Sequence, residues 1–316
     1  SDTHHTLLKT MHHSITDGWS GPILLNQVHT YYEQLASNQA MVIQEETAYL
    51  RAQAYLASEK ASCDAYWQDK LAQVEQVNDV NALLSKHVDL DSPKIMMKPR
   101  NVAIKITGSS YQALKQLVHT EGLTLTVLLQ FAWHKLIQVY TRDTQTIVGT
   151  TVSGRALPIA GIESSVGLYI NTLPLIVDWS SSDDVRTQLH AIHNSLEALN
   201  HHSSVNLSEL QHEGGGLFHS LFVFENYPEP DDSDAWDVRV RDAIEKVDYP
   251  LSLMAYEEKE GLHVELHYDG SYLLHERAKR ILAQAHFILE QLPHQHDEPH
   301  HALTLLGETE YKTLVY

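Results

Sequence analysis

Apolar side chains recur at helical spacing in the first third of the chain. After Ser20 and Pro22, which are typical of a helix start, this spacing predicts a helix from about Pro22 to Ala36. A second, longer helix is predicted from about Thr47 to Val74, a stretch without proline or glycine. The segment from Asn78 to Pro99 then turns polar and contains two prolines. We expect this segment to be a linker between two lobes.

Beyond this linker, strand patterns alternate with helical patterns. Strands are predicted at Val102–Ile106, Thr146–Val152, Leu168–Val177, Leu217–Phe224, Val238–Val240, Leu251–Tyr256 and Leu262–Tyr268. Helices are predicted at Ser109–His119, which Gly122 closes, at Thr124–Thr141 and at His275–Leu292. A further helix is predicted to run to about Asn200, with Ser182 as its cap and Asp183 and Asp184 in its first turn. The Glu260-Gly261 turn joins the last two strands into a hairpin. This mixture predicts an open α/β layer architecture.

Composition and charge narrow the class of protein. The chain has 316 residues, 43% of them hydrophobic, which suffices for a sizeable core. Its net charge of −19 would repel a phosphate backbone, so nucleic acid is not expected as a partner. Ser1–Thr10 lacks a secretion-signal pattern and no run of about 18 apolar residues occurs, so the working assumption is a cytoplasmic protein without a membrane partner. The single cysteine, Cys63, excludes an internal disulfide.

Histidine is unusually frequent and has to be interpreted with care. The chain contains 22 histidines, four times as adjacent pairs, and about one or two such pairs are expected by chance. A pair alone therefore carries little information. The tail Pro293–His301 has metal-ligating residue types without a fixed spacing, so we expect a surface loop and no metal site.

The stretch Met11–Ser20 (MHHSITDGWS) is the most informative in the chain. It places a histidine, an acid and a turn glycine just ahead of a predicted helix, and such a loop can aim one imidazole at a cleft. Adjacent side chains on an extended backbone point apart, so His12 and His13 cannot both face one substrate. One of the two is expected to be catalytic and the other structural. From the residues alone, a loop histidine without catalytic function is an equal alternative.

This stretch resembles the His-His-x-x-x-Asp-Gly signature of the condensation-domain superfamily, which includes chloramphenicol acetyltransferase-like enzymes. Further stretches resemble the family in the expected order: VGTTVSGR, VGLYINTLP, LFHSLFVFENYP, VDYPLSL and, as an exit linker toward an adenylation domain, ALTLLGETEYKTL. The chain is therefore identified as similar to condensation domains of nonribosomal peptide synthetases along its whole length.

The resemblance implies a chloramphenicol acetyltransferase-like fold of α/β class, with two lobes of mixed sheets flanked by helices that face each other across a tunnel. In the family, a lobe on the order of a hundred residues or more precedes the signature. We therefore expect that most of the N-terminal lobe is lacking and that this polypeptide alone is inactive. The expected organisation is a remnant of that lobe at 1–77, the linker at 78–99, a C-terminal lobe at 100–301 and the exit linker at 302–316.

The resemblance also implies the chemistry. The family joins a donor acyl thioester to an acceptor amine, and His13 is its second histidine, acting as a general base or as an orienter of the amine. His12 is expected to shape the loop. Asp17 is either a triad-like acid that orients the imidazole or, as we favour, the structural partner of an arginine from the other lobe, best matched by Arg155.

Weaker assignments follow for neighbouring residues. Gly18 is expected to supply a backbone angle or close approach, and Trp19 is expected to pack beneath the loop or to contact substrate. Ser153, Asn171 and Thr172 are candidates for hydrogen bonds to substrates, although ordinary strand or turn roles explain them equally well.

The partners implied by the family are donor and acceptor peptidyl carrier domains, which bring phosphopantetheine thioesters, and an adjacent adenylation domain. No cofactor or metal bound by this domain is expected. An epimerisation domain lacks support because its glutamate motif is missing, and a cyclisation domain because its signature has aspartates in place of the histidines. An O-acyltransferase or a noncatalytic fragment that docks carriers remain alternatives.

Overall fold

The computed structural model describes residues 8–12, 14–43, 45–90, 96–211, 216–225 and 249–307. The chain divides into two compact units. Unit 1 comprises Ser1–Ala61, Ser153–Asn171 and Tyr227–Asp242, and unit 2 comprises Ser62–Val152, Thr172–Asn226 and Ala243–Tyr316. Three distant stretches of sequence therefore make up each unit.

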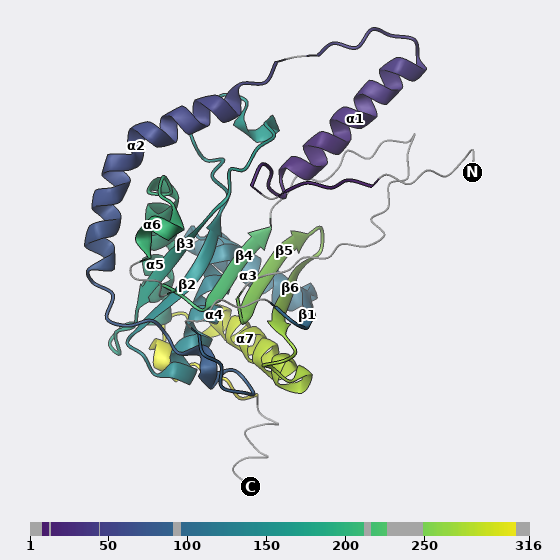
Figure 1. Cartoon of the computed structure of the whole chain (residues 1–316). Coiled ribbons are helices and arrows are strands. Elements are labelled where there is room, and N and C mark those ends of the chain that lie inside the picture. Colours follow the sequence, from purple (N-terminus) through teal and green to yellow (C-terminus); the bar gives the residue numbers. More distant parts are fainter. Residues whose placement is uncertain are drawn as a thin grey trace. The chain divides into compact units, whose positions relative to one another are not determined.

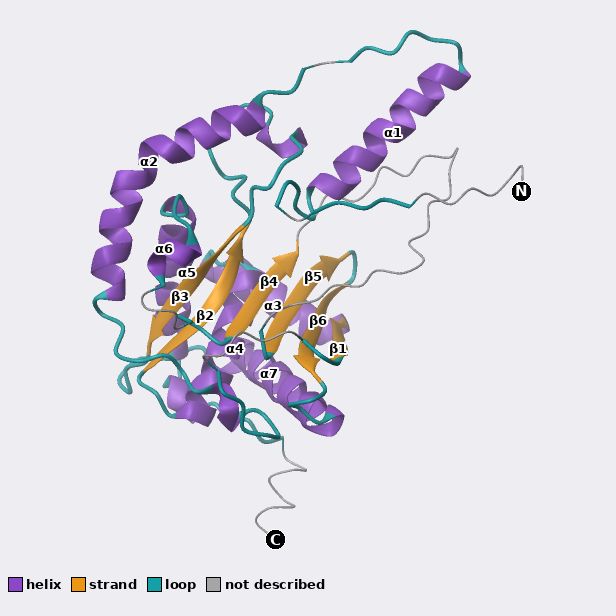
Figure 2. Cartoon of the chain, viewed as in Figure 1, coloured by secondary structure: helices purple, strands orange, loops and turns teal. Residues whose placement is uncertain are grey.

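A mixed six-stranded sheet forms the centre of unit 2 (Figures 1 and 2). Its strands are β1 (Pro99–Thr107), β2 (Gln145–Val152), β3 (Asn171–Asp178), β4 (Ser220–Glu225), β5 (Leu251–Glu258) and β6 (Gly261–Asp269), in the order β1-β6-β5-β4-β2-β3. β6 is antiparallel to both β1 and β5, whereas β4 is parallel to both β5 and β2. Glu258 pairs with Gly261, so the predicted hairpin is confirmed, but its turn is Lys259-Glu260, one residue before the predicted Glu260-Gly261.

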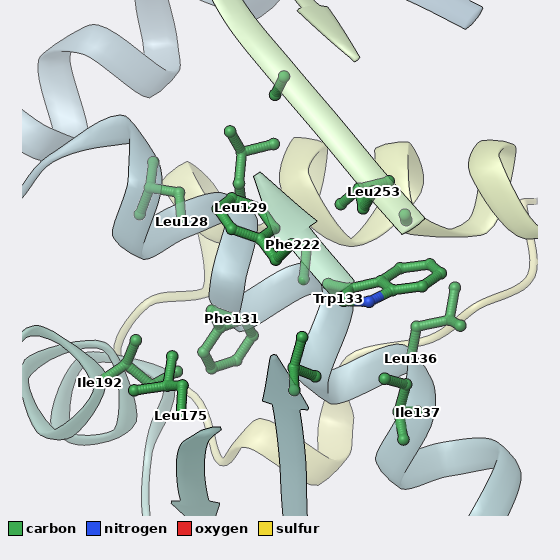
Figure 3. Close-up of a cluster of buried hydrophobic side chains, with 14 of the residues drawn as sticks. Leu128, Leu129, Phe131, Trp133, Leu136, Ile137, Leu175, Ile192, Phe222 and Leu253 are labelled. Atoms are coloured by element: carbon green, nitrogen blue, oxygen red, sulfur yellow. The ribbon is translucent and has the colours of Figure 1, made fainter. Parts of the chain in front are cut away.

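Helices α3 (Gly108–Glu121), α4 (Leu125–Thr141) and α7 (His275–Gln295) lie behind the sheet in the view of Figure 2. α5 (Val185–His201) packs against α4, and the short α6 (Leu207–Leu210) follows it. α4 is apolar almost all round, so it is buried on nearly every face rather than along one stripe. Its side chains meet those of β3, β4, β5 and α5 in the core (Figure 3), where the residues drawn include Phe131, Trp133, Leu175, Ile192 and Phe222.

Unit 1 contains α1 (Ser20–Ala36), the first part of α2 (Ala48–Leu71) and the irregular segment 153–171 with a short 3-10 turn at Ile162–Ser164. A small apolar cluster of Ala52, Ile162 and Tyr169 joins the start of α2 to this segment. Polar contacts to the same segment add to this packing among the described residues.

Most of the predicted elements are present, with informative differences. The cap of α5 is Asp184, whose side chain accepts from the Thr187 N–H, so the prediction of Ser182 as the cap was wrong. β3 begins at Asn171 and not at Leu168, because the preceding residues bond to the start of α1. The predicted strand Val238–Val240 lies outside the described residues.

The polar segment after Asn78 contributes to the core of unit 2. Val80, Leu83, Leu84 and Val88 belong to the main apolar cluster. The buried Asn78 accepts from the Ile147 N–H and donates to the Gln145 carbonyl. Whether 78–99 also connects two lobes stays a prediction.

In the part of the chain that the structure describes, no helix is both long and apolar enough to cross a membrane.

Candidate functional site

Asp17 is the centre of a hydrogen-bond network in unit 1. Its side chain is fully buried, although it lies in a loop. Asp17 Oδ1 accepts from the backbone N–H of Ser20, the first residue of α1, at 3.0 Å. Ser20 Oγ lies 2.9 Å from Asp17 Oδ1 and 3.0 Å from the Gly167 carbonyl oxygen, and it accepts from the Gly167 N–H. The loop before α1 is thus tied to the segment 153–171.

Arg155 supplies the countercharge to Asp17. Arg155 Nη2 lies 3.1 Å from Asp17 Oδ1 and 3.3 Å from Oδ2, so the expected ion pair is present, and both residues belong to unit 1. Arg155 Nη1 donates to the carbonyl oxygens of Ile162 and Ser165. The guanidinium therefore bridges the aspartate and the backbone of its own loop. A buried pair with such additional hydrogen bonds fixes geometry more reliably than it adds stability.

Two aromatic rings complete the surroundings of the guanidinium. The carbon of the Arg155 guanidinium lies 4.2 Å from the centroid of the Tyr169 ring and 5.5 Å from that of the Trp19 ring. The Tyr169 N–H donates to Asp17 Oδ2, and the Trp19 indole N–H donates to the Glu163 carbonyl. Burial raises the pKa of the Tyr169 phenol above its ordinary value.

Glycine is required at the turn that precedes Arg155. Gly154 has φ of +63°, and a Cβ added there would lie 2.0 Å from the Tyr169 carbonyl oxygen. A side chain would be both strained and in collision with backbone. The SGR sequence thus lets the chain pass close to Tyr169 before Arg155 turns toward Asp17.

Glu46 and Ser165 extend the network to the start of α2. One oxygen of Glu46 accepts from the Ala48 N–H, and the other accepts from Ser165 Oγ at 2.7 Å. Ser165 is fully buried, and its Oγ in turn accepts from the Tyr169 hydroxyl at 2.6 Å. These contacts link parts of the chain that are more than a hundred residues apart.

The histidine loop is described in part. His13 lies outside the described residues. His12 is exposed, and its Nδ1 accepts from the Ser14 N–H at 3.1 Å and lies 2.7 Å from Ser14 Oγ. His12 also accepts from the Ile15 N–H through its carbonyl, so its contacts are those of a residue that shapes a turn. Gly18 lies in the turn that leads into α1, and its carbonyl accepts from the Gly21 N–H.

Asp17 has little capacity left to orient an imidazole. A carboxylate offers about four lone-pair positions. Five described contacts already reach its two oxygens, from Ser20 N–H and Oγ, from Arg155 Nη2 (twice) and from Tyr169 N–H. This occupancy favours the structural interpretation of Asp17 over the triad-like one.

The weaker candidates Ser153, Asn171 and Thr172 lie in two places. Ser153 is exposed and accepts from the Arg155 N–H at 3.4 Å. Asn171 and Thr172 are the first two residues of β3 and are half-buried. A substrate role for these residues, and for Trp19, stays a prediction.

Sequence reasoning did not find Ser20, Glu46, Ser165 or Tyr169 as site residues. Ser20 had a usable signal, because an aspartate three residues ahead of a helical N–H is a common capping pattern. The other three had no such signal, since each acts through a contact with a residue far away along the chain.

Among the described residues, no three metal-ligating side chains are placed to hold a metal ion.

The chain is similar to parts of very large synthases. It is 33% identical to the N-(5-amino-5-carboxypentanoyl)-L-cysteinyl-D-valine synthase of Penicillium rubens, over 99% of this chain and 9% of that protein. It is 32% identical to the synthase of the same name from Amycolatopsis lactamdurans, over 96% of this chain and 9% of that protein. It is 25% identical to bacitracin synthase 3 of Bacillus licheniformis, over 100% of this chain and 5% of that protein. The chain thus spans less than a tenth of the length of these relatives.

Solved structures share the fold at low sequence identity. The X-domain from teicoplanin biosynthesis superposes with a TM-score of 0.78 at 16% identity, over 94% of this chain and 71% of that one. The first condensation domain of the CDA synthetase superposes with a TM-score of 0.73 at 15% identity, over 94% of this chain and 66% of that one. These likenesses confirm the predicted condensation-domain fold, an α/β fold with a mixed sheet and flanking helices.

A family model described as "Condensation domain" matches residues 1–315. Together with the relatives above, this match shows that the chain belongs to the condensation-domain family and is similar over nearly its whole length to the condensation domains of nonribosomal peptide synthetases.

Proposed function

We propose that this chain is the part of a nonribosomal peptide synthetase that joins a donor acyl or peptidyl group to the amine of an acceptor aminoacyl group. Both substrates arrive as phosphopantetheine thioesters on carrier domains, and an adenylation domain follows the chain. The observation that carries the proposal is the buried Asp17–Arg155 pair, which anchors the loop directly after His12 and His13. A loop held in this way can present one imidazole in a fixed direction.

The reaction needs an amine that is unprotonated when it attacks. The amine nitrogen attacks the thioester carbon, the C–N bond forms, and a tetrahedral oxyanion results. Its collapse breaks the C–S bond and releases the donor arm as a thiol, which takes up the proton that the amine loses. An imidazole titrates near neutral pH, so His13 can hold the amine in position and relay this proton. Such a group contributes roughly a hundredfold to ten-thousandfold in rate.

The described site residues support this role indirectly. Asp17 and Arg155 hold the loop, and His12 accepts hydrogen bonds from the Ser14 and Ile15 N–H groups of the same loop. Trp19, Ser153, Asn171 and Thr172 are proposed to contact the substrates or their arms. No metal or resident cofactor has a part in the proposal, because the carriers bring the reactive thioesters.

The test uses the synthetase polypeptide in which this chain is embedded, with loaded donor and acceptor carriers and with mass spectrometry of the product. His13→Ala is expected to lower the rate of amide formation at least about a hundredfold. His119→Ala, an equal change at an exposed position on α3, is the matched control and is expected to leave the rate unchanged. Undiminished amide from His13→Ala would overturn the proposal.

The same assay separates the alternatives. An O-acyltransferase would give ester with an alcohol acceptor and no amide. A noncatalytic platform would bind loaded carriers without any product, and His13→Ala would then change nothing. Either result contradicts the proposed amide-forming activity.

A further inference from the structure

The start of α2 holds the segment 153–171 at several points. Glu46 joins the Ala48 N–H to Ser165 Oγ through its two carboxylate oxygens. One turn further on, Arg51 Nη2 donates to the Ala160 carbonyl at 2.8 Å. These contacts come from residues just before and within the first turn and a half of one helix. The start of α2 and the residues just before it are therefore hydrogen-bonded to the segment 153–171.

Aromatic packing makes the same connection. The rings of Tyr49 and Tyr169 meet edge to face, with centroids 5.3 Å apart. A Cβ on Gly167 would lie 2.3 Å from the Tyr49 ring, so the backbone passes directly beneath that ring. The position of Tyr169 is thus defined from the α2 side as well as from the side of Asp17.

Ser165 connects Glu46 to the ion pair. Its hydroxyl donates to Glu46 and accepts from the Tyr169 hydroxyl, while its carbonyl oxygen accepts from Arg155 Nη1 at 2.9 Å. Arg155 in turn binds Asp17, four residues after His13. A continuous series of hydrogen bonds therefore runs from Glu46 to the histidine loop, entirely within unit 1.

We infer that Glu46 is a positioning residue for the reaction, acting on the histidine loop through Ser165 and Arg155. This inference rests on the proposed function. A carboxylate can only accept hydrogen bonds, so Glu46 fixes the direction of the two hydroxyl bonds at Ser165, from Ser165 Oγ to Glu46 and from the Tyr169 hydroxyl to Ser165 Oγ. Ser165 has to give its single proton to Glu46, and its remaining lone pairs are then available to Tyr169. The carbonyl of Ser165 is thereby held in the place where it meets Arg155.

Loss of Glu46 is expected to affect geometry more than folding. Glu46 is exposed, whereas Ser165, Arg155 and Asp17 are buried, so the core contacts of the unit survive its removal. The Ser165 hydroxyl, however, would lose its acceptor and rotate toward another one. The loop would then occupy several arrangements, of which only one suits the reaction.

The experiment compares Glu46→Ala with Glu45→Ala in the synthetase polypeptide that contains this chain. Both changes remove one negative charge from adjacent exposed positions of the same loop. Glu46→Ala is expected to lower kcat for amide formation about tenfold, because small misplacements of reacting groups cost up to about a hundredfold. The KM for each loaded carrier is expected to change by less than about twofold, since no substrate contact is removed. Glu45→Ala should behave as the unchanged protein.

A conservative variant and a measurement of hydrogen exchange separate a positioning role of Glu46 from a merely structural one. Glu46→Gln keeps the size of the side chain and one acceptor oxygen, so it should recover part of the lost rate. Hydrogen exchange measured by mass spectrometry adds a readout that needs no activity. Peptides from 14–20 and 153–171 should exchange faster in Glu46→Ala than in Glu45→Ala, while peptides of unit 2 exchange at the same rate in both variants.

The outcomes separate this inference from the proposed function. If His13→Ala abolishes the product but Glu46→Ala and Glu45→Ala are indistinguishable in rate and in exchange, the positioning role is wrong and the proposed function stands. If His13→Ala retains full activity, the proposed function fails whatever Glu46 does. A fall in melting temperature with unchanged exchange in 14–20 would show that Glu46 has a merely structural role.

Discussion

Asp17 and Arg155 show how much depends on single buried charges. Each is nearly inaccessible to solvent, and each uses the other as its countercharge. Removing one partner of a buried pair leaves the other charge unpaired, which costs about 3–5 kcal/mol. We therefore expect Asp17→Asn to lower the free energy of unfolding of the chain by about this amount in urea denaturation.

A double-mutant cycle isolates the pair. Arg155→Met alone should be similarly destabilising, but the double variant should cost less than the sum of the two, because no unpaired charge remains. Additive effects would contradict the pairing as the source of the loss. An Asp17→Asn synthetase that keeps its stability but makes no product would instead restore the triad-like interpretation of Asp17.

The residue scale also shows where sequence reasoning stops. The HHSITDG stretch and the arginine of SGR could be read in the sequence, and the structure brings Asp17 and Arg155 together. Glu46 and Ser165 meet across 119 positions, and Asp17 and Tyr169 across 152. The periodicity of a single sequence does not show which residues so far apart along the chain meet in the fold. Residues that act through such contacts were therefore missed.

At the scale of elements, the hydrogen bonds at the start of α5 show which of two nearby side chains caps the helix. Asp184 Oδ1 accepts from the Thr187 N–H at 2.7 Å, whereas the Ser182 hydroxyl bonds within the preceding turn. Asp184→Ala should therefore cost about 1 kcal/mol of stability, and Ser182→Ala should cost little. Thermal unfolding of both variants checks this, and equal losses would reinstate Ser182.

The pH dependence of the same cap has a defined sign. The Thr187 N–H lowers the pKa of Asp184 below its ordinary value. A carboxylate with a lowered pKa stabilises the folded state above the pKa of the unfolded chain, and the contribution is lost as the pH falls through the folded value. The difference between the protein and Asp184→Ala should thus shrink below about pH 4.

Elements with strong patterns were predicted well, and their ends less well. The buried α4 and the β5–β6 hairpin follow directly from apolar runs and a turn of suitable length. The end of a strand depends instead on what its neighbours bond to. β3 starts three residues later than predicted because the backbone at Gly167 and Tyr169 is already engaged by Ser20 and Asp17. The segment 78–99 was predicted as a polar linker, and four of its apolar side chains lie in the core of unit 2, which the polar composition of the segment did not indicate.

At the scale of the molecule, we expect the acid stability of unit 2 to depend on a histidine that the proposed function does not use. His134 lies on α4 and is fully buried, with Nδ1 2.7 Å from Thr146 Oγ1. Its Nε2 has no hydrogen-bond partner among the described residues. Burial lowers the pKa of His134 to about 3, so the folded state keeps this imidazole neutral.

The sign of the effect follows from this neutral form. An unfolded histidine takes up its proton near pH 6.5, whereas folded His134 does so only near 3. Stability is therefore complete above about pH 6.5 and declines as the pH falls toward 3, by up to about 1.4 kcal/mol per pH unit. His134→Asn offers Oδ1 to Thr146 in place of Nδ1 and has nothing to protonate, so this decline should be weaker in the variant.

The comparison has to be made as a difference, because the chain has 22 histidines and His134 is only one of them. Urea denaturation at pH 7.5 and at pH 5 should show His134→Asn destabilised relative to the unchanged protein at the higher pH and much less so at the lower one. His119→Asn, at an exposed site on α3, controls for the loss of a surface histidine. A gap between His134→Asn and the unchanged protein that is the same at both pH values would show that His134 titrates in the folded state as it does in the unfolded chain and is not kept neutral by burial.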